Sequence, residues 1–138
     1  MEIPIEVYQR IVSAKIFMDE NFDQALDLNI ISRHSCISRF HFHRLFTRIY
    51  RKTPHRYLTQ KRIDNAKHML AENKLTVSEI CNTVGFESVG SFSILFKKEI
   101  GFAPQYYRNL AFRKKKLAQE QPKHFIPHCF IESYQMDR

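Results

Sequence analysis

Apolar residues recur at intervals of three and four along most of the chain, which is the spacing of one face of an α-helix. In the first such segment, residues 4–20, Ile5, Tyr8, Val12 and Ile16 form one apolar stripe. The same spacing and its breaks predict further helices over residues 28–35, 38–50, 53–72, 76–84, 88–98 and 104–118. With three Gly and no Asn-Gly hairpin signal, a β protein is disfavoured. The predicted fold class is all-α, with about seven helices.

Residues that cap helix N-termini stand at the predicted starts, and they are Asp27, Ser38, Thr53, Thr76 and Ser88. Pro54 suits the first position of a helix because its missing N–H would have no helical partner there. Glu79 lies three residues after Thr76, which is the spacing of a capping box. These signals place short turns between neighbouring helices at residues 36–37 and 85–86.

A set of core positions repeats along the chain at one offset. Phe42, Leu45, Phe46, Pro54 and Tyr57 return 50 residues later as Phe92, Leu95, Phe96, Pro104 and Tyr107. Two helices joined by a short turn form a helix-turn-helix unit, so the repeat predicts two such units. We expect the first unit over residues 1–52, a linking helix over 53–73, the second unit over 74–118 and a tail over 119–138.

Positive charge is concentrated in the first half of the chain. Residues 28–63 contain nine Lys or Arg and four His but no Asp or Glu, and the whole chain has a net charge of +8. This balance favours a polyanionic partner. The side chains of the 38–50 helix that point away from its apolar face are Phe40, His43, Arg44 and Thr47. Because an α-helix fits the DNA major groove and Arg can donate two hydrogen bonds to guanine, we predict that these four side chains read bases.

The spacing of the cysteines and the length of the apolar runs indicate where in the cell the protein is located. Cys36, Cys81 and Cys129 are widely spaced and form no C-x-x-C pair, which favours free thiols in a reducing compartment. No apolar run approaches the length of a membrane span, and residues 1–4 do not open a signal peptide. We therefore expect a cytoplasmic location and no membrane partner. The sequence has no Gly-rich phosphate loop and no paired catalytic carboxylates, so we predict no enzyme activity and no catalytic residues.

One stretch has a specific signature, Val84-Gly85-Phe86-x5-Phe92-Ser93-x2-Phe96-Lys97-Lys98-x2-Gly101-x2-Pro104-x2-Tyr107-Arg108. Together with Arg44-Leu45-Phe46 and Arg62-Ile63-x2-Ala66, it resembles the DNA-binding domain of the AraC/XylS family of bacterial transcription regulators over roughly residues 5–112. The resemblance implies two helix-turn-helix units of homeodomain-like, three-helical type, joined by a long helix. It also implies double-stranded DNA as partner, a nucleoid-associated location and, for activation, contact with RNA polymerase.

The resemblance leaves the extent of the whole protein open. Only about twenty residues, which form the first helix of the first unit, precede its helix-turn-helix pair. The chain therefore resembles the small stand-alone regulators of the family, or else a fragment of a longer regulator. A monomer with two units can bind DNA, and a dimer would form only through a missing domain.

Four positions depart from the family pattern. Cys36 stands in the first turn where the family often has Gly, so we expect its backbone not to be left-handed. Ser32 and Cys81 occupy the small-residue position where the two helices of each unit approach, and the thiol of Cys81 is accordingly expected to be structural. Ile94 stands where the family commonly has Arg or another polar residue.

The second unit is predicted to read bases weakly. Its outward face carries Gly90, Ser93 and Ile94, and of these Ile94 can contact a thymine methyl but cannot bond a base edge. Residues 64–102 hold four Lys or Arg against five acids. We therefore expect the first unit to dominate base readout and the second to add mainly phosphate contacts. The phosphate candidates are Ser38, Arg39, Arg48, Arg51, Lys52 and Arg56 in the first half and Ser88, Ser91, Lys97 and Lys98 in the second.

The linking helix has a length that suits two groove segments. Its predicted residues rise to roughly 28 Å, comparable with the distance of about 34 Å between successive major-groove faces on one side of B-DNA. One chain could thus span two adjacent segments.

Potential metal ligands occur in two groups, which are His34, Cys36, His41 and His43 near the first turn and His124, His128 and Cys129 in the tail. Neither group has zinc-finger spacing, so we predict no metal site and no other cofactor. The alternative function is a non-enzymatic interaction module or a metal-responsive regulator, in which the tail recruits a partner or an ion. The tail either packs as an extended segment, which its apolar residues Phe125, Ile126, Phe130 and Ile131 favour, or stays mobile.

Overall fold

A computed structural model describes residues 2–127 of the chain. Its helices are α1 (Ile5–Asn21), α2 (Leu28–Ser35), α3 (Arg39–Tyr50), α4 (Pro54–Glu72), α5 (Val77–Thr83), α6 (Val89–Ile100), α7 (Pro104–Glu120) and the 3-10 helix η1 (Pro122–Phe125). Over the described residues the chain forms no strand. The all-α prediction with seven helices is confirmed.

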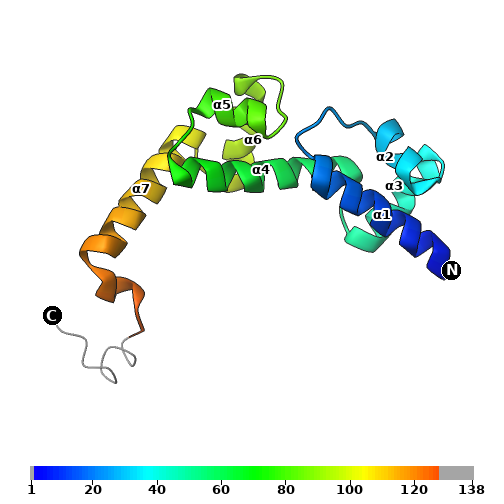
Figure 1. Cartoon of the computed structure of the whole chain (residues 1–138), viewed down its shortest axis with the longest axis horizontal. Helices are drawn as coiled ribbons and strands as arrows, with labels where there is room; N and C mark the ends of the chain where they lie inside the picture. The colour runs from blue at the N-terminus through cyan, green and yellow to red at the C-terminus, as the bar shows by residue number, and fades with distance from the viewer. Residues whose placement is uncertain (1, 128–138) are drawn as a thin grey trace.

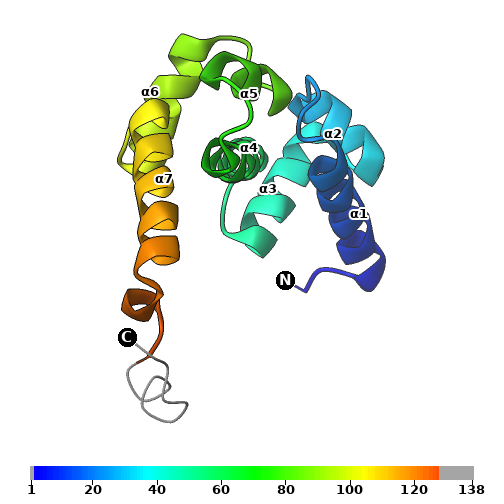
Figure 2. The ribbon, with the colours of Figure 1, turned by 60° about the vertical axis from the view of Figure 1, so that its left-hand side comes forward.

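Helix α4 is the axis of the molecule (Figure 1). Viewed along α4, helices α1–α3 lie to one side of it, whereas α6 and α7 lie to the other and α5 above it (Figure 2). Two separate hydrophobic cores result. Leu58 of α4 belongs to the core of the first unit, whereas Ile63, Ala66 and Leu70 belong to that of the second.

The predicted repeat is visible in how the aromatic rings pack. Phe42 and Phe46 are fully buried in the first core, and Phe92 and Phe96 are fully buried in the second. Tyr57 meets the Phe46 ring edge-on with 5.6 Å between ring centroids. Tyr107 meets the Phe96 ring in the same way, also at 5.6 Å. Equivalent side chains thus make equivalent contacts in the two units.

Most of the predicted helix starts are confirmed by hydrogen bonds. The side chains that accept a bond from the backbone N–H three residues later are those of Asp27, Thr53, Thr76 and Ser88, with distances of 2.8, 3.1, 3.1 and 3.1 Å. Ser38 stands at the predicted N-cap of α3, but its side chain makes no capping bond. Its backbone carbonyl accepts the first helical bond from the Phe42 N–H at 2.8 Å, as the carbonyls of the other N-cap residues do in their helices.

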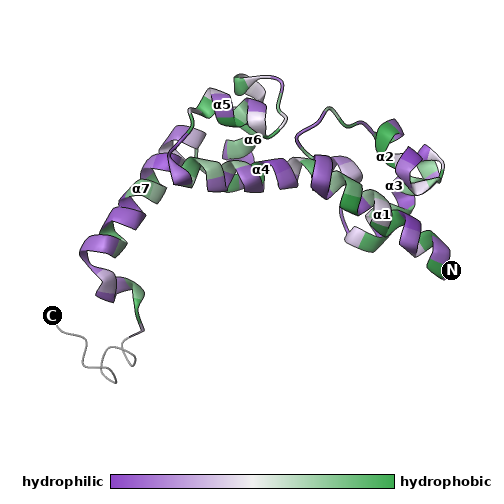
Figure 3. Cartoon of the chain, in the orientation of Figure 1, coloured by the Kyte–Doolittle hydropathy of each residue, from purple (hydrophilic) through white to green (hydrophobic). Residues whose placement is uncertain are grey.

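The apolar stripe expected to pack α1 faces solvent, which is a correction to the sequence analysis. Ile5 is 64% exposed, and Tyr8, Val12 and Ile16 are also exposed. The buried side of α1 is formed by Ile11, Ala14 and Met18, which lie on the other side of the helix. Because α1 carries apolar residues on two sides, spacing alone selected the longer stripe rather than the one that packs. Figure 3 shows both hydrophobic and hydrophilic residues along α1, whereas α7 is mostly hydrophilic.

The backbone at Cys36 is left-handed, contrary to expectation, with φ 55° and ψ 30°. Helix α2 ends here, and the Cys36 N–H donates to the Arg33 carbonyl at 3.2 Å. The Ser35 hydroxyl accepts from the Ile37 N–H at 3.2 Å and continues the turn. The second unit has Gly85 in its turn with φ 97°. A left-handed residue therefore occurs in both turns, and in the first unit a cysteine adopts it.

Replacing Cys36 with glycine is expected to stabilise the chain by about 0.5–1 kcal/mol. A non-glycine residue in this conformation costs about 1–2 kcal/mol, and the greater backbone entropy of unfolded glycine offsets part of the gain. Cys36 is exposed, so no packing is lost. Urea denaturation measures the difference, with Cys36→Ala as the control that keeps a Cβ. Equal stability of the glycine and alanine variants would contradict the prediction.

The predictions for Cys81 and for the C-terminal tail have different outcomes. Cys81 is fully buried in the second core, as expected for a packing residue, and burial raises the pKa of its thiol. The extended tail is wrong for residues 122–125, which form η1 with Phe125 44% exposed. The expectations for Phe130 and Ile131 lie outside the described residues.

Candidate nucleic-acid interface

The outward face of α3 is only partly what its sequence predicted. Phe40 is 70% exposed, and Arg44 is also exposed. The Arg39 guanidinium lies over the Phe40 ring, 4.7 Å from its centroid. Thr47 is half-buried and donates its hydroxyl hydrogen to the His43 carbonyl at 2.7 Å. Thr47 can therefore act toward DNA as an acceptor, whereas Phe40 and Arg44 are exposed.

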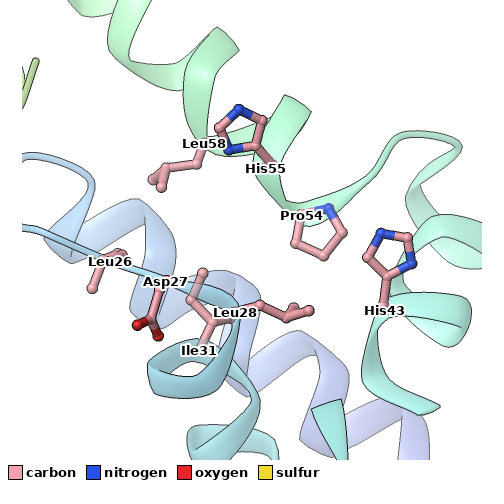
Figure 4. Close-up of a pocket in the computed structure, with 8 residues that line it drawn as sticks. All are labelled: Leu26, Asp27, Leu28, Ile31, His43, Pro54, His55 and Leu58. Carbon is pink, nitrogen blue, oxygen red and sulfur yellow. The ribbon is translucent and has the colours of Figure 1, made fainter. Parts of the chain in front are cut away.

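His43 contributes to packing as well as to the outer face. It is half-buried and lines a small pocket of about 90 Å³ together with Pro54 of α4 and Ile31 of α2. Figure 4 shows His43 on the α3 side of this pocket. Of the four base-reading candidates on α3, Phe40 and Arg44 are thus the most accessible.

The outward face of α6 is open and largely apolar. Ile94 is 74% exposed, and a Cβ added to Gly90 would meet no atom within 4 Å. Ser93 is half-buried between them. The structure places Gly90 and Ile94 on the surface as expected, at positions equivalent to Phe40 and Arg44 in the repeat.

The phosphate candidates differ in their exposure and in the hydrogen bonds and ion pairs that they already make. The exposed ones are Ser38, Arg39, Arg48, Arg51, Arg56, Ser88, Ser91, Lys97 and Lys98, whereas Lys52 is half-buried. Arg39 donates to Asn29 Oδ1 at 3.3 Å, and Lys52 donates to Gln60 Oε1 at 2.6 Å. Arg56 is paired with Glu99, with 2.9 Å between Nη2 and Oε2 and a second contact between Nη1 and Oε1. Sequence reasoning missed this pair, because its partners are 43 residues apart.

Replacing Glu99 with glutamine is expected to strengthen DNA binding and make it more salt-dependent. The Glu99 side chain is only 10% exposed and holds the Arg56 guanidinium in a two-bond ion pair. Freed of the opposing charge, Arg56 would neutralise one more phosphate, which changes the slope of log affinity against log salt by about −0.9. The slope is measured by fluorescence anisotropy. The control, Glu72→Gln, removes an exposed acid at the end of α4, and an equal change in both variants would contradict the prediction.

The His and Cys side chains near the first turn are not gathered into one cluster. Within residues 2–127 no group of three His, Cys, Asp or Glu side chains is placed to hold a metal ion. His34 instead stacks on the Phe17 ring with 3.5 Å between centroids. His128 and Cys129 lie outside the described residues. Among the described helices, none is long and apolar enough to cross a membrane.

Comparisons with known proteins agree with this geometry. A family described as "Helix-turn-helix domain" matches residues 31–110. The Melibiose operon regulatory protein of Escherichia coli strain K12 is 31% identical over 99 residues, which are 72% of this chain and 33% of that protein. The chain therefore spans about a third of the length of this relative.

Two solved structures share the fold. One is a transcriptional regulator described with "AraC-type DNA-binding domain-containing proteins" from Chromobacterium violaceum, with a TM-score of 0.69, 22% identity and coverage of 75% of this chain and 93% of that one. The other is the DNA-binding domain of AdpA, a global transcriptional factor, in complex with a target DNA, with a TM-score of 0.69, 20% identity and coverage of 81% and 96%.

The family match over residues 31–110 and the two repeated units on α4 together define a helix-turn-helix DNA-binding domain. The chain belongs to the AraC-type helix-turn-helix family, as its signature residues indicated.

Proposed function

We propose that this chain is a sequence-specific DNA-binding regulator of transcription that places α3 and α6 in two adjacent major-groove segments. The observation that carries the proposal is the presence of two equivalent helices, α3 and α6, each with an exposed face, in units that share the continuous helix α4. The 19 residues of α4 rise to about 28 Å, close to the spacing of successive groove faces. Family membership supports the same function.

The first unit dominates base readout in this proposal. Arg44 is exposed and can donate two hydrogen bonds to one guanine, and Phe40 beside it offers an apolar surface to thymine methyls. The second unit presents Gly90 and Ile94, which offer no hydrogen-bonding side chain. Ser88, Ser91, Lys97 and Lys98 then add phosphate contacts that position α6 without specifying sequence.

The same proposal includes the wider properties expected of such a regulator. A single chain binds DNA as a monomer, since both units belong to it, and dimerisation requires a further domain. We place the protein in the cytoplasm, associated with the nucleoid, without enzymatic activity and with RNA polymerase as a second partner. The unit boundaries proposed are residues 1–52, 53–73, 74–118 and 119–138.

Selection from a random double-stranded DNA pool tests the function. The selection is run at about 150 mM salt, because at low salt any strongly basic protein binds DNA without specificity. The expected product is a motif with one sharply defined segment and one weaker segment about a helical turn away. Two equally sharp segments would contradict the division between the units. Binding at low salt with no motif would overturn sequence-specific recognition.

A further inference from the structure

The two units touch at a joint between the α1–α2 connection and the α5–α6 turn. Phe22, in the connection, packs against both hydrophobic cores. At Gly85, in the turn, an added Cβ would lie 2.9 Å from the Asp23 carbonyl oxygen and 3.1 Å from Arg62 Nε. The backbones of the two units are therefore in close contact here, and only glycine leaves enough space.

Arg62 of α4 holds this joint together. Its Nε donates to the Phe22 carbonyl at 2.7 Å, and its Nη2 donates to the Gln24 carbonyl at 2.8 Å. Its guanidinium carbon lies 5.9 Å from the centroid of the Phe86 ring in the second unit. Burial lowers the pKa of Arg62 while nearby Asp23 raises it, and an arginine stays charged in proteins. One charged side chain thus bonds the first unit and faces an aromatic ring of the second.

Beside the joint the units are separated by an open cleft of about 720 Å³. Leu26 and Asp27 line it from the first unit, and Ser88 and Ser91 line it from the second. In the view along α4, the first unit and α6–α7 diverge to different sides of that helix (Figure 2). The angle between the units about the α4 axis is therefore set by how each core packs on α4 and by the contacts that bridge the units, since an open cleft does not resist rotation.

We propose that Arg62 is a positioning residue that sets the angle between the two units and thereby selects the spacing between the two DNA segments that α3 and α6 bind. Arg62 acts through the joint without contacting a base. The proposal rests on the function proposed above. It adds a determinant of specificity that lies between the two DNA-binding surfaces, because a fixed angle favours one arrangement of grooves over its neighbours.

The test compares Arg62→Ala with Arg10→Ala, which removes an equal charge from an exposed position of α1. Binding is measured to the selected two-segment DNA, to versions with one or two base pairs added or removed between the segments, and to DNA with the first segment alone. Loss of the fixed angle lowers the effective concentration of the second unit. Relative to the control, Arg62→Ala should bind the two-segment DNA about tenfold more weakly and the single-segment DNA within about twofold.

The spacing profile separates positioning from general destabilisation. The wild-type chain should prefer one spacing, Arg62→Ala should lose most of that preference, and Arg62→Lys, which retains the charge and one possible bond to a carbonyl, should be intermediate. Thermal melting confirms that each variant is folded at the binding temperature. An equal loss on one-segment and two-segment DNA, or an unchanged spacing profile, would overturn the proposal.

A measurement without DNA distinguishes this proposal from the function on which it rests. Nuclear spin relaxation of the full ¹⁵N-labelled chain should give one tumbling time for both units in the wild type and two in Arg62→Ala. A single tumbling time in the variant overturns the role of Arg62 even where no DNA motif is found. Absence of a motif for the wild-type chain, with separate tumbling in the variant, overturns the DNA function and the spacing role but retains the joint.

Discussion

Replacing Phe46 with alanine should lower the free energy of unfolding by about 3–5 kcal/mol, the usual cost of removing a buried aromatic ring. Phe46 is fully buried. Its ring centroid lies 4.6 Å from that of Tyr50 and 5.6 Å from those of Phe42 and Tyr57. These rings come from α3 and α4, so the cavity would open where the two helices join and could not easily collapse. Since domains are stable by only about 5–15 kcal/mol, the loss is a large share of the total.

Phe40→Ala is the matched control for Phe46→Ala, because it removes the same ring from the same helix at a position that is 70% exposed. Its free energy of unfolding should change by less than about 0.5 kcal/mol, while its DNA affinity falls. Urea denaturation and DNA binding are measured on both variants. Equal destabilisation of the two would contradict the assignment of one ring to the core and the other to the interface.

Replacing Arg44 with alanine should weaken binding to the selected DNA by about 1–3 kcal/mol and relax the preference at one base position. The reason is that a guanidinium can donate two parallel hydrogen bonds to one guanine, and alanine leaves that base without a partner. The affinity is measured for the selected site and for sites with each base of the first segment changed. Unchanged affinity together with unchanged selectivity would reject the role of Arg44.

Arg39→Ala provides the comparison for a phosphate contact. It should weaken binding to all sequences by a similar factor and reduce the salt slope by about one unit. Arg10→Ala, on the exposed side of α1, controls for the loss of one positive charge at a distance from α3. A relaxed base preference in Arg39→Ala would mean that the two arginines had been assigned the wrong roles.

The internal repeat made the fold predictable. Phe42, Phe46 and their counterparts Phe92 and Phe96 recur at one offset, and a repeated core implies a repeated unit. Helix starts were predictable because capping is a local interaction between residues three apart. The α1 stripe was predicted on the wrong side, because its spacing is equally regular on both sides and only tertiary packing decides which side is buried.

The parts that could not be predicted depend on contacts between distant residues. Nothing near Arg56 in the sequence indicates Glu99, and nothing near Arg62 indicates the carbonyls of Phe22 and Gln24. At Cys36 the residue type gave the wrong prediction, because the helix-to-helix turn imposes a left-handed backbone on a residue that does not prefer it. The candidate base-reading residues were predicted from helical geometry, and their roles on DNA remain predictions.

Two features bear on how the chain folds. Phe22 packs against both cores, and α4 contributes side chains to each of them. A cut within α4 would leave two helical fragments of about ten residues, which are marginal in water without their tertiary partners. It would also separate Phe22 from one of the cores that bury it. The two DNA-binding units are therefore one cooperative folding unit, and heat or denaturant should unfold both in a single transition.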